Sequence, residues 1–233
     1  MKTLFAAILC SAAAMAALGE VYLKGPKIGP RAKGSAVPTR AFRELFEAKS
    51  LMSEPVVCNG VRTEMQVSLI LRPLEELLAE LRARYPDLQF NLRRGGVLFS
   101  IRLGARWRER VLLVGGDNRV TVFTMRLPDP MPKLPAWPRT LPALPDDAEA
   151  DEIIEFPKSG GVYGSFSGAG PGALSRMTAD LAARGYAPVT KEALSARGKG
   201  ELFLNAAKQQ MITLSIGPDG TGTVCCTPLA VRK

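Results

Sequence analysis

The chain contains one pattern of residues twice, and the two copies begin about 100 positions apart. The first copy covers 73–124 and the second covers 171–227. In each copy, a proline or glycine opens an apolar helical pattern, and three short β-rich runs follow. A duplicated pattern constrains the architecture before any single motif is considered, because both copies are expected to form the same supersecondary structure.

In the first copy, polar and apolar residues alternate over 65–71, which is the period of a strand. Leucines then recur at helical spacing from Leu74 to Leu81, after Pro73, a residue suited to the first turn of a helix. Three further strands are predicted at 97–103, 110–114 and 120–125, with Gly115–Asn118 as the turn between the last two.

The second copy repeats this order. A strand is predicted at 162–167, and apolar residues from Leu174 to Leu181 then follow the period of a helix. Three more strands are predicted at 202–204, 211–216 and 223–227, with Pro218–Gly220 as a turn. In our alignment of the copies, Thr213 takes the position of Val111, so the second copy is the more polar one.

These patterns predict an α+β fold: a tandem duplication of a small β-α-β-β-β unit, each with one helix packed on an antiparallel sheet. Units of about 65 residues bury little core alone, so we expect the copies to pack together or to depend on residues 39–60. The expected organisation is a signal peptide at 1–19, a basic arm and short helix at 20–60, the first α+β unit at 61–128, a Pro-rich acidic linker at 129–157 and the second α+β unit at 158–233.

The linker is rich in proline. Its dense prolines are Pro128, Pro130, Pro132, Pro135, Pro138, Pro142 and Pro145. This spacing excludes regular secondary structure and favours an extended, semi-rigid connector. Acidic residues from Asp146 to Glu155 follow and predict a solvated stretch.

The N-terminus has the pattern of a secretory signal peptide. Lys2 precedes an uncharged apolar run at 3–18, and Ala17 and Gly19 supply the small residues that signal peptidase requires. The run is short for a membrane-spanning helix, which needs about 20 apolar residues. We therefore expect a periplasmic or secreted protein, and the alternative is an inner-membrane protein anchored by the uncleaved run.

The 233-residue chain contains no histidine, which excludes Ser-His and Cys-His nucleophilic catalysis and histidine metal ligands. Adjacent cysteines on a strand, such as Cys225 and Cys226, point to opposite faces, so only one of them is expected to face the core. In an oxidising compartment two alternatives stay open: no disulfide, or one bridge from Cys58 to either of that pair. No metal site or cofactor is expected, because adjacent cysteines lack the spacing of zinc ligands.

The turn Gly168–Ala173 fits the spacing G-x-G-x-x-A between a strand and a helix, which is the setting of a dinucleotide-binding fingerprint. The surrounding pattern lacks further alternating strands and helices, and no acidic residue follows at the required distance. We interpret Gly168, Gly170 and Gly172 as a structural turn. The alternative is an anion contact made by free N–H groups at the helix N-terminus.

Arginines surround Trp107 in the first copy: Arg82, Arg84, Arg93, Arg94, Arg102, Arg106, Arg108 and Arg110. The whole chain carries a formal net charge of +9. These residues are interpreted either as a solvated surface or as an anion-binding face centred on Arg106, Arg108 and Arg110. Export makes nucleic acid an unexpected partner.

No set of acidic, serine or lysine side chains shows the convergent pattern of a catalytic site, so no catalytic residue is assigned. The sequence favours an exported, non-enzymatic binding or scaffold protein of the cell envelope or the secreted fraction. Its expected partner is an anionic envelope surface or another envelope protein. Two alternatives stay open: a membrane-tethered version, and a His-free enzyme or anion-binding domain that uses the Gly168–Ala173 turn.

Overall fold

The computed structural model describes residues 41–93, 96–189 and 199–229. The predicted signal peptide, the arm before Ala41 and Arg94 lie outside the described residues. The described chain forms two compact units. Of the described residues, the N-terminal unit contains 41–54 and Thr63–Met131, and the C-terminal unit contains Pro55–Arg62 and those from Pro132 onward.

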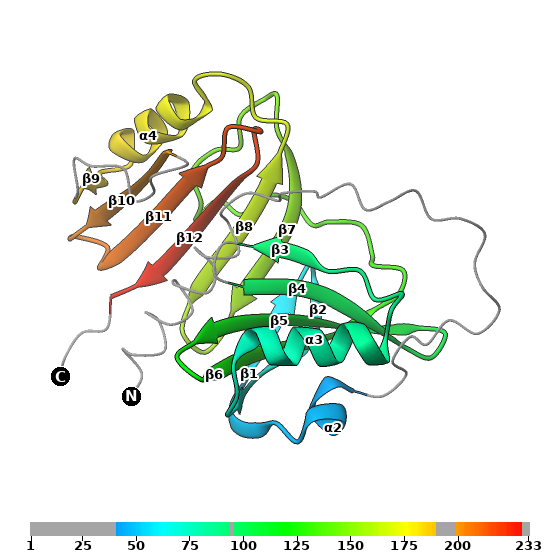
Figure 1. Cartoon of the computed structure of the whole chain (residues 1–233). Helices are drawn as coiled ribbons and strands as arrows, with labels where there is room; N and C mark the ends of the chain where they lie inside the picture. The colour runs from blue at the N-terminus through cyan, green and yellow to red at the C-terminus, as the bar shows by residue number, and fades with distance from the viewer. Residues whose placement is uncertain (1–40, 94–95, 190–198, 230–233) are drawn as a thin grey trace. The chain divides into compact units, whose positions relative to one another are not determined.

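The N-terminal unit contains two helices and most of six strands (Figure 1). In chain order these are α2 (Phe42–Phe46), β1 (Lys49–Cys58), β2 (Val61–Ile70), α3 (Leu74–Arg84), β3 (Asn91–Arg93), β4 (Gly96–Leu103), β5 (Trp107–Gly116) and β6 (Arg119–Pro128). The strands are neighbours in the order β3-β4-β5-β6-β2-β1. The short helix predicted before residue 60 is thus present as α2.

The C-terminal unit contains β7 (Glu149–Phe156), β8 (Gly161–Ser167), α4 (Ala173–Ala183), β9 (Ala187–Pro188), β10 (Lys199–Asn205), β11 (Gln210–Ile216) and β12 (Gly222–Pro228). Its strands are neighbours in the order β7-β8-β12-β11-β10-β9 and pair antiparallel. The end of β1 also belongs to this unit, because Val57 and Cys58 pair with Glu155 and Ile154 of β7.

The predicted α+β class, built from two β-α-β-β-β units, is wrong. The described chain is mostly antiparallel sheet, and its three helices contain only 5, 11 and 11 residues. Four strands escaped the sequence prediction. Exposed residues and Pro55 interrupt the apolar alternation of β1, acidic residues obscure β7 within the segment assigned to the linker, and β3 and β9 are very short.

The connectivity of one unit recurs in the other. In both, two strands precede the helix and four strands follow it. The last strand, β6 or β12, pairs with the strand before the helix, β2 or β8. The recurring element is therefore longer than the one read from the sequence, because it begins one strand earlier and contains an additional short strand after the helix.

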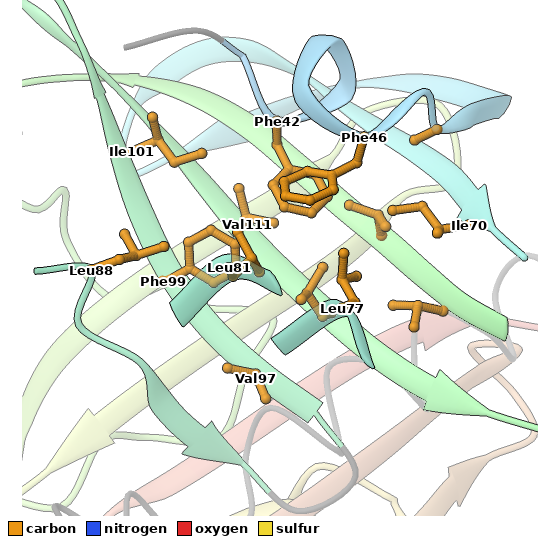
Figure 2. Packing of buried hydrophobic residues seen from close by; sticks show 14 residues of the cluster. Phe42, Phe46, Ile70, Leu77, Leu81, Leu88, Val97, Phe99, Ile101 and Val111 are labelled. Carbon is orange, nitrogen blue, oxygen red and sulfur yellow. The ribbon is translucent and has the colours of Figure 1, made fainter. Parts of the chain in front are cut away.

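The core of the N-terminal unit lies between α3 and one face of its sheet (Figure 2). Leu77 and Leu81 of α3 are fully buried, as are Val111 and Leu113 of β5. Phe42 of α2 joins this cluster, and its ring lies edge-on to Phe99 of β4 at 5.7 Å. Burial of these side chains supplies the main force that holds α3 and α2 on the sheet.

The corresponding core of the C-terminal unit contains Met177 and Leu181 of α4 together with Ile212 and Leu214 of β11. These two β11 residues are the counterparts of the buried pair on β5. Our alignment of Thr213 with Val111 is therefore shifted by one residue, which exchanges the two faces of a strand.

The proline-rich segment contributes to this core. We call residues 137–147 the strap. Trp137 and Leu141 of the strap pack against the cluster under α4. They cross β8 at Gly164, where a β-carbon would lie 2.6 Å from the Trp137 ring and 2.8 Å from Leu141. This part of the predicted extended connector is therefore packed against the sheet, and glycine is required where it crosses.

Polar residues at the C-terminal end of α4 hold the strap. The Arg184 guanidinium donates to the carbonyls of Leu141 and Arg139 at 2.5 and 2.8 Å, and the Asp180 carboxylate accepts from the Ala143 N–H at 3.1 Å. Asp180 lies in the last turn of α4 and Arg184 is its C-cap, four positions later, so both lie on one side of the helix. The strap is thus fixed largely through its main chain.

Candidate functional site

The Gly168–Ala173 turn joins β8 to α4, as predicted, and its N–H groups are close to a carboxylate of the chain itself. The Gly170 N–H donates to Asp147 Oδ2 at 3.0 Å. Arg176, in the first turns of α4, donates to both oxygens of Asp147 at 2.8 and 3.1 Å. The strap therefore ends with an acidic side chain placed where an anionic ligand would bind.

The environment of Asp147 favours its ionised form. Desolvation acts to raise the pKa of this carboxyl, but the backbone N–H donors and the Arg176 guanidinium outweigh it and lower the pKa below its usual value. Gly170 is needed for this contact, since a β-carbon there would lie 2.4 Å from the Asp147 oxygen. Gly168 and Gly172 occupy the same turn, and these contacts support a structural role for it.

The structure brings together only some members of the arginine cluster. Arg102 of β4 and Arg108 of β5 face each other across the β4–β5 hairpin and share Asp129. Arg102 Nη2 lies 3.1 Å from Asp129 Oδ2, and Arg108 donates to Oδ1. Hydrogen bonds from Arg108 and then from Arg102 lower the pKa of Asp129 below its usual value.

Arg106 is exposed between these strands, and its carbonyl accepts from the Asp129 N–H at 2.9 Å. The adjacent Trp107 remains 46% exposed at the start of β5. We call residues 102–108 the hairpin tip. The sequence pointed to its arginines and tryptophan but missed Asp129, which becomes their neighbour only once β5 and β6 pair with Trp107 opposite Pro128.

The other arginines of the cluster are dispersed. Arg82 lies over the Phe90 ring, and Arg84 pairs with Glu80 on α3. Arg110 is half-buried on β5, so it is not part of the exposed tip. Arg93 belongs to β3, but the structure does not describe its side chain. The anion-binding face predicted around 106, 108 and 110 is thus better defined by Arg102, Arg106 and Arg108.

All three described cysteines are buried thiols. Cys58 Sγ lies 3.6 Å from Glu152 Oε1, and Cys225 Sγ lies 3.7 Å from Thr227 Oγ1. Cys226 faces the core under α4. Of the adjacent pair, only Cys226 belongs to this core cluster, although Cys225 on the other face of β12 is also buried.

A buried carboxylate was missed by the sequence reading. Glu109 on β5 is 7% exposed, and its Oε2 accepts from the Phe42 N–H at 2.6 Å. Burial raises the pKa of this glutamate despite the hydrogen bond from Phe42 and the nearby charge of Arg126. Its alternation with Val111 on one face of the strand would place it in the core, and that is the signal that could have found it.

We also searched the described residues for membrane-spanning helices and for metal-binding clusters. Within the described ranges, no helix has the length and apolar character needed to cross a bilayer. The same residues contain no group of three or more acidic or thiol side chains positioned to hold a metal ion.

The chain matches no protein-family model, and neither the curated proteins nor the solved structures include a significant match.

Proposed function

We propose that this chain is an exported, non-enzymatic binding protein of the cell envelope that attaches to an anionic surface through the hairpin tip. The observation that supports this proposal is that Arg102 and Arg108 share one carboxylate, Asp129, while Arg106 lies exposed between them in the chain. The tip carries three arginines against this single carboxylate, so it keeps a positive charge.

The arginines of the tip are accessible to a partner although two of them form ion pairs. The side chain of Arg102 is 70% exposed and that of Arg108 is 39% exposed. Exposed ion pairs contribute little to stability, since solvent screens them, and a partner can compete for their donors. Phosphate and carboxylate groups suit this arrangement, because a guanidinium binds such groups through two parallel hydrogen bonds.

Export is supported by the signal pattern at 1–19. The proposal also holds for the tethered alternative, in which residues 3–18 stay uncleaved. We do not extend it to the Gly168–Ala173 turn, because Asp147 already accepts from the Gly170 N–H.

Charge reversal at the tip tests the proposal. We expect Arg106→Glu to lower the salt concentration that elutes the protein from immobilised heparin, because nonspecific charge attraction weakens as net positive charge falls and as salt screens it. The matched control is Arg119→Glu, an exposed arginine of the same unit at the turn between β5 and β6. Equal losses in the control and the tip variant would show that total charge, and not the tip, governs retention.

A further inference from the structure

The hairpin tip combines its charge with an exposed apolar surface. Trp107 is the largest exposed apolar side chain among the described residues, and Gly104 and Ala105 beside it are also exposed. Leu103, which pairs with Trp107 across the hairpin, is half-buried. The end of this hairpin therefore presents an indole ring and small apolar residues between arginines.

The two tryptophans of the chain have different surroundings. Trp137 in the strap packs edge-on against Phe166 and donates its indole N–H to the Pro142 carbonyl at 2.9 Å. Trp107, in contrast, is 46% exposed to solvent. A tryptophan buries a large apolar area when it packs, so the core of this unit gains little from Trp107.

An exposed indole beside arginines matches the chemistry of a bilayer interface. The ring of tryptophan is stable at the headgroup level, where its apolar body meets acyl chains and its N–H meets water or headgroups. Arginines beside it attract anionic lipid headgroups electrostatically. One such contribution alone gives only marginal binding, whereas two together give stable attachment to a bilayer.

We propose that the anionic surface is a lipid bilayer, with Trp107 inserted among the headgroups and Arg102, Arg106 and Arg108 in contact with lipid phosphates. This inference rests on the proposed function, and it adds the substrate class and the anchoring residue. The end of a β-hairpin is convex, whereas pockets that bind small molecules are concave. A bilayer can accommodate a convex apolar group, so it fits the tip better than a small molecule does.

Vesicle binding tests the inference. We expect the full chain to bind vesicles of phosphatidylglycerol and phosphatidylcholine but not vesicles of phosphatidylcholine alone. Trp107→Ala is expected to weaken binding roughly tenfold, or about 1.4 kcal/mol. The matched control is Leu71→Ala, which removes the most exposed apolar side chain of the same unit, at 78% exposure, away from the tip, and should leave binding unchanged.

Fluorescence measures insertion directly. Brominated lipid should quench the wild-type emission, and this quenching should disappear in Trp107→Ala, whose remaining tryptophan is Trp137. Retention on heparin reports charge alone, so we expect the same Trp107→Ala variant to elute at the wild-type salt concentration. Circular dichroism of each variant controls for folding.

The possible outcomes separate the two proposals. Loss of vesicle binding in Arg106→Glu together with wild-type binding in Trp107→Ala would overturn insertion and leave the proposed function standing. Retention on heparin without any binding to anionic vesicles would identify a polysaccharide as the surface and overturn the lipid inference. Failure of the wild type on both surfaces would overturn both proposals.

Discussion

At the scale of single residues, Glu109 is a titratable group buried in the N-terminal unit, where it also contributes to packing. Its carboxylate is the acceptor for the Phe42 N–H, and so it holds α2 against the sheet. The same burial that excludes water from this hydrogen bond also raises the pKa of the acid. The groups that face it are Arg126, Glu44 and Arg43, which leave the raised value in place.

This raised pKa predicts a pH dependence of stability. Between the unfolded pKa of a glutamate, about 4.3, and the higher folded value, the native state binds more protons than the unfolded state. The free energy of unfolding should therefore fall as pH rises through that interval. Glu109→Gln keeps the acceptor but removes the titration, so its urea-unfolding free energy should lack this decrease.

Glu109→Ala is the comparison variant, because it removes both the acceptor and the titration. We expect it to be less stable than Glu109→Gln at every pH, since the Phe42 N–H then loses its partner. A parallel pH dependence in the wild type and Glu109→Gln would show that another group causes the decrease.

The sequence reveals those parts of the candidate sites that depend on neighbouring residues, and it misses their distant partners. The Gly168–Ala173 turn was recognised because glycine spacing is a local signal. Its carboxylate partner was not, because Asp147 lies 23 residues away from Gly170 and belongs to a segment without periodicity. Asp129 was missed for a similar reason, since its position beside Arg102 depends on the pairing of three strands.

At the scale of elements, α3 and α4 occur where the spacing of apolar residues predicts them. The apolar face of each helix packs against strands of its own unit. The strap behaved differently. Its prolines correctly exclude a helix or a strand, but proline spacing does not tell whether a segment packs. The acceptors for Arg184 are main-chain carbonyls, which every sequence contains. The one local signal was Gly164 inside a strand.

Filling the space at Gly164 tests the role of the strap. We expect Gly164→Ala to destabilise the C-terminal unit by about 1–3 kcal/mol, because its β-carbon would overlap Trp137 and Leu141. Urea unfolding followed by tryptophan fluorescence measures this loss. The control is Gly116→Ala, whose β-carbon meets its nearest neighbour, Arg119, at an ordinary 3.6 Å, and which should change stability by less than about 0.5 kcal/mol.

A second substitution decides whether the overlap with the strap is the cause. Combined with Gly164→Ala, Trp137→Leu should cost less than the sum of the two single changes, because the smaller side chain leaves room for the new methyl group. Strict additivity would mean that the strap does not pack on β8 in solution.

At the scale of the whole molecule, the error in fold class came from strands and not from helices. Each unit was expected to contain four strands around one helix, whereas six strands belong to each recurring pattern. Fold class depends on how much of the chain pairs with other strands. The exposed first half of β1 and the acidic face of β7 carry weak signals for such pairing.

The C-terminal unit is discontinuous in the chain, because it includes the turn between β1 and β2. At this turn Asn59 and Gly60 both have positive φ, at 49° and 80°, as a two-residue hairpin of type I′ requires. Asn59 continues the pairing of β1 with β7. Its N–H donates to the Ile153 carbonyl at 2.8 Å, and its side-chain oxygen accepts from the Ile153 N–H at 2.7 Å.

The last prediction follows from this double contact. Asn59→Gly tolerates the positive φ but removes the acceptor for the Ile153 N–H, so we expect a loss of about 1–3 kcal/mol and faster hydrogen exchange at Ile153. The control is Asn118→Gly in the β5–β6 turn, at a similar φ of 50° but exposed, where little should change. If both variants lose the same stability, the turn conformation is responsible. If only Asn59→Gly is affected, the Asn59 side chain is responsible, and it joins the β1–β2 turn to β7 of the C-terminal unit.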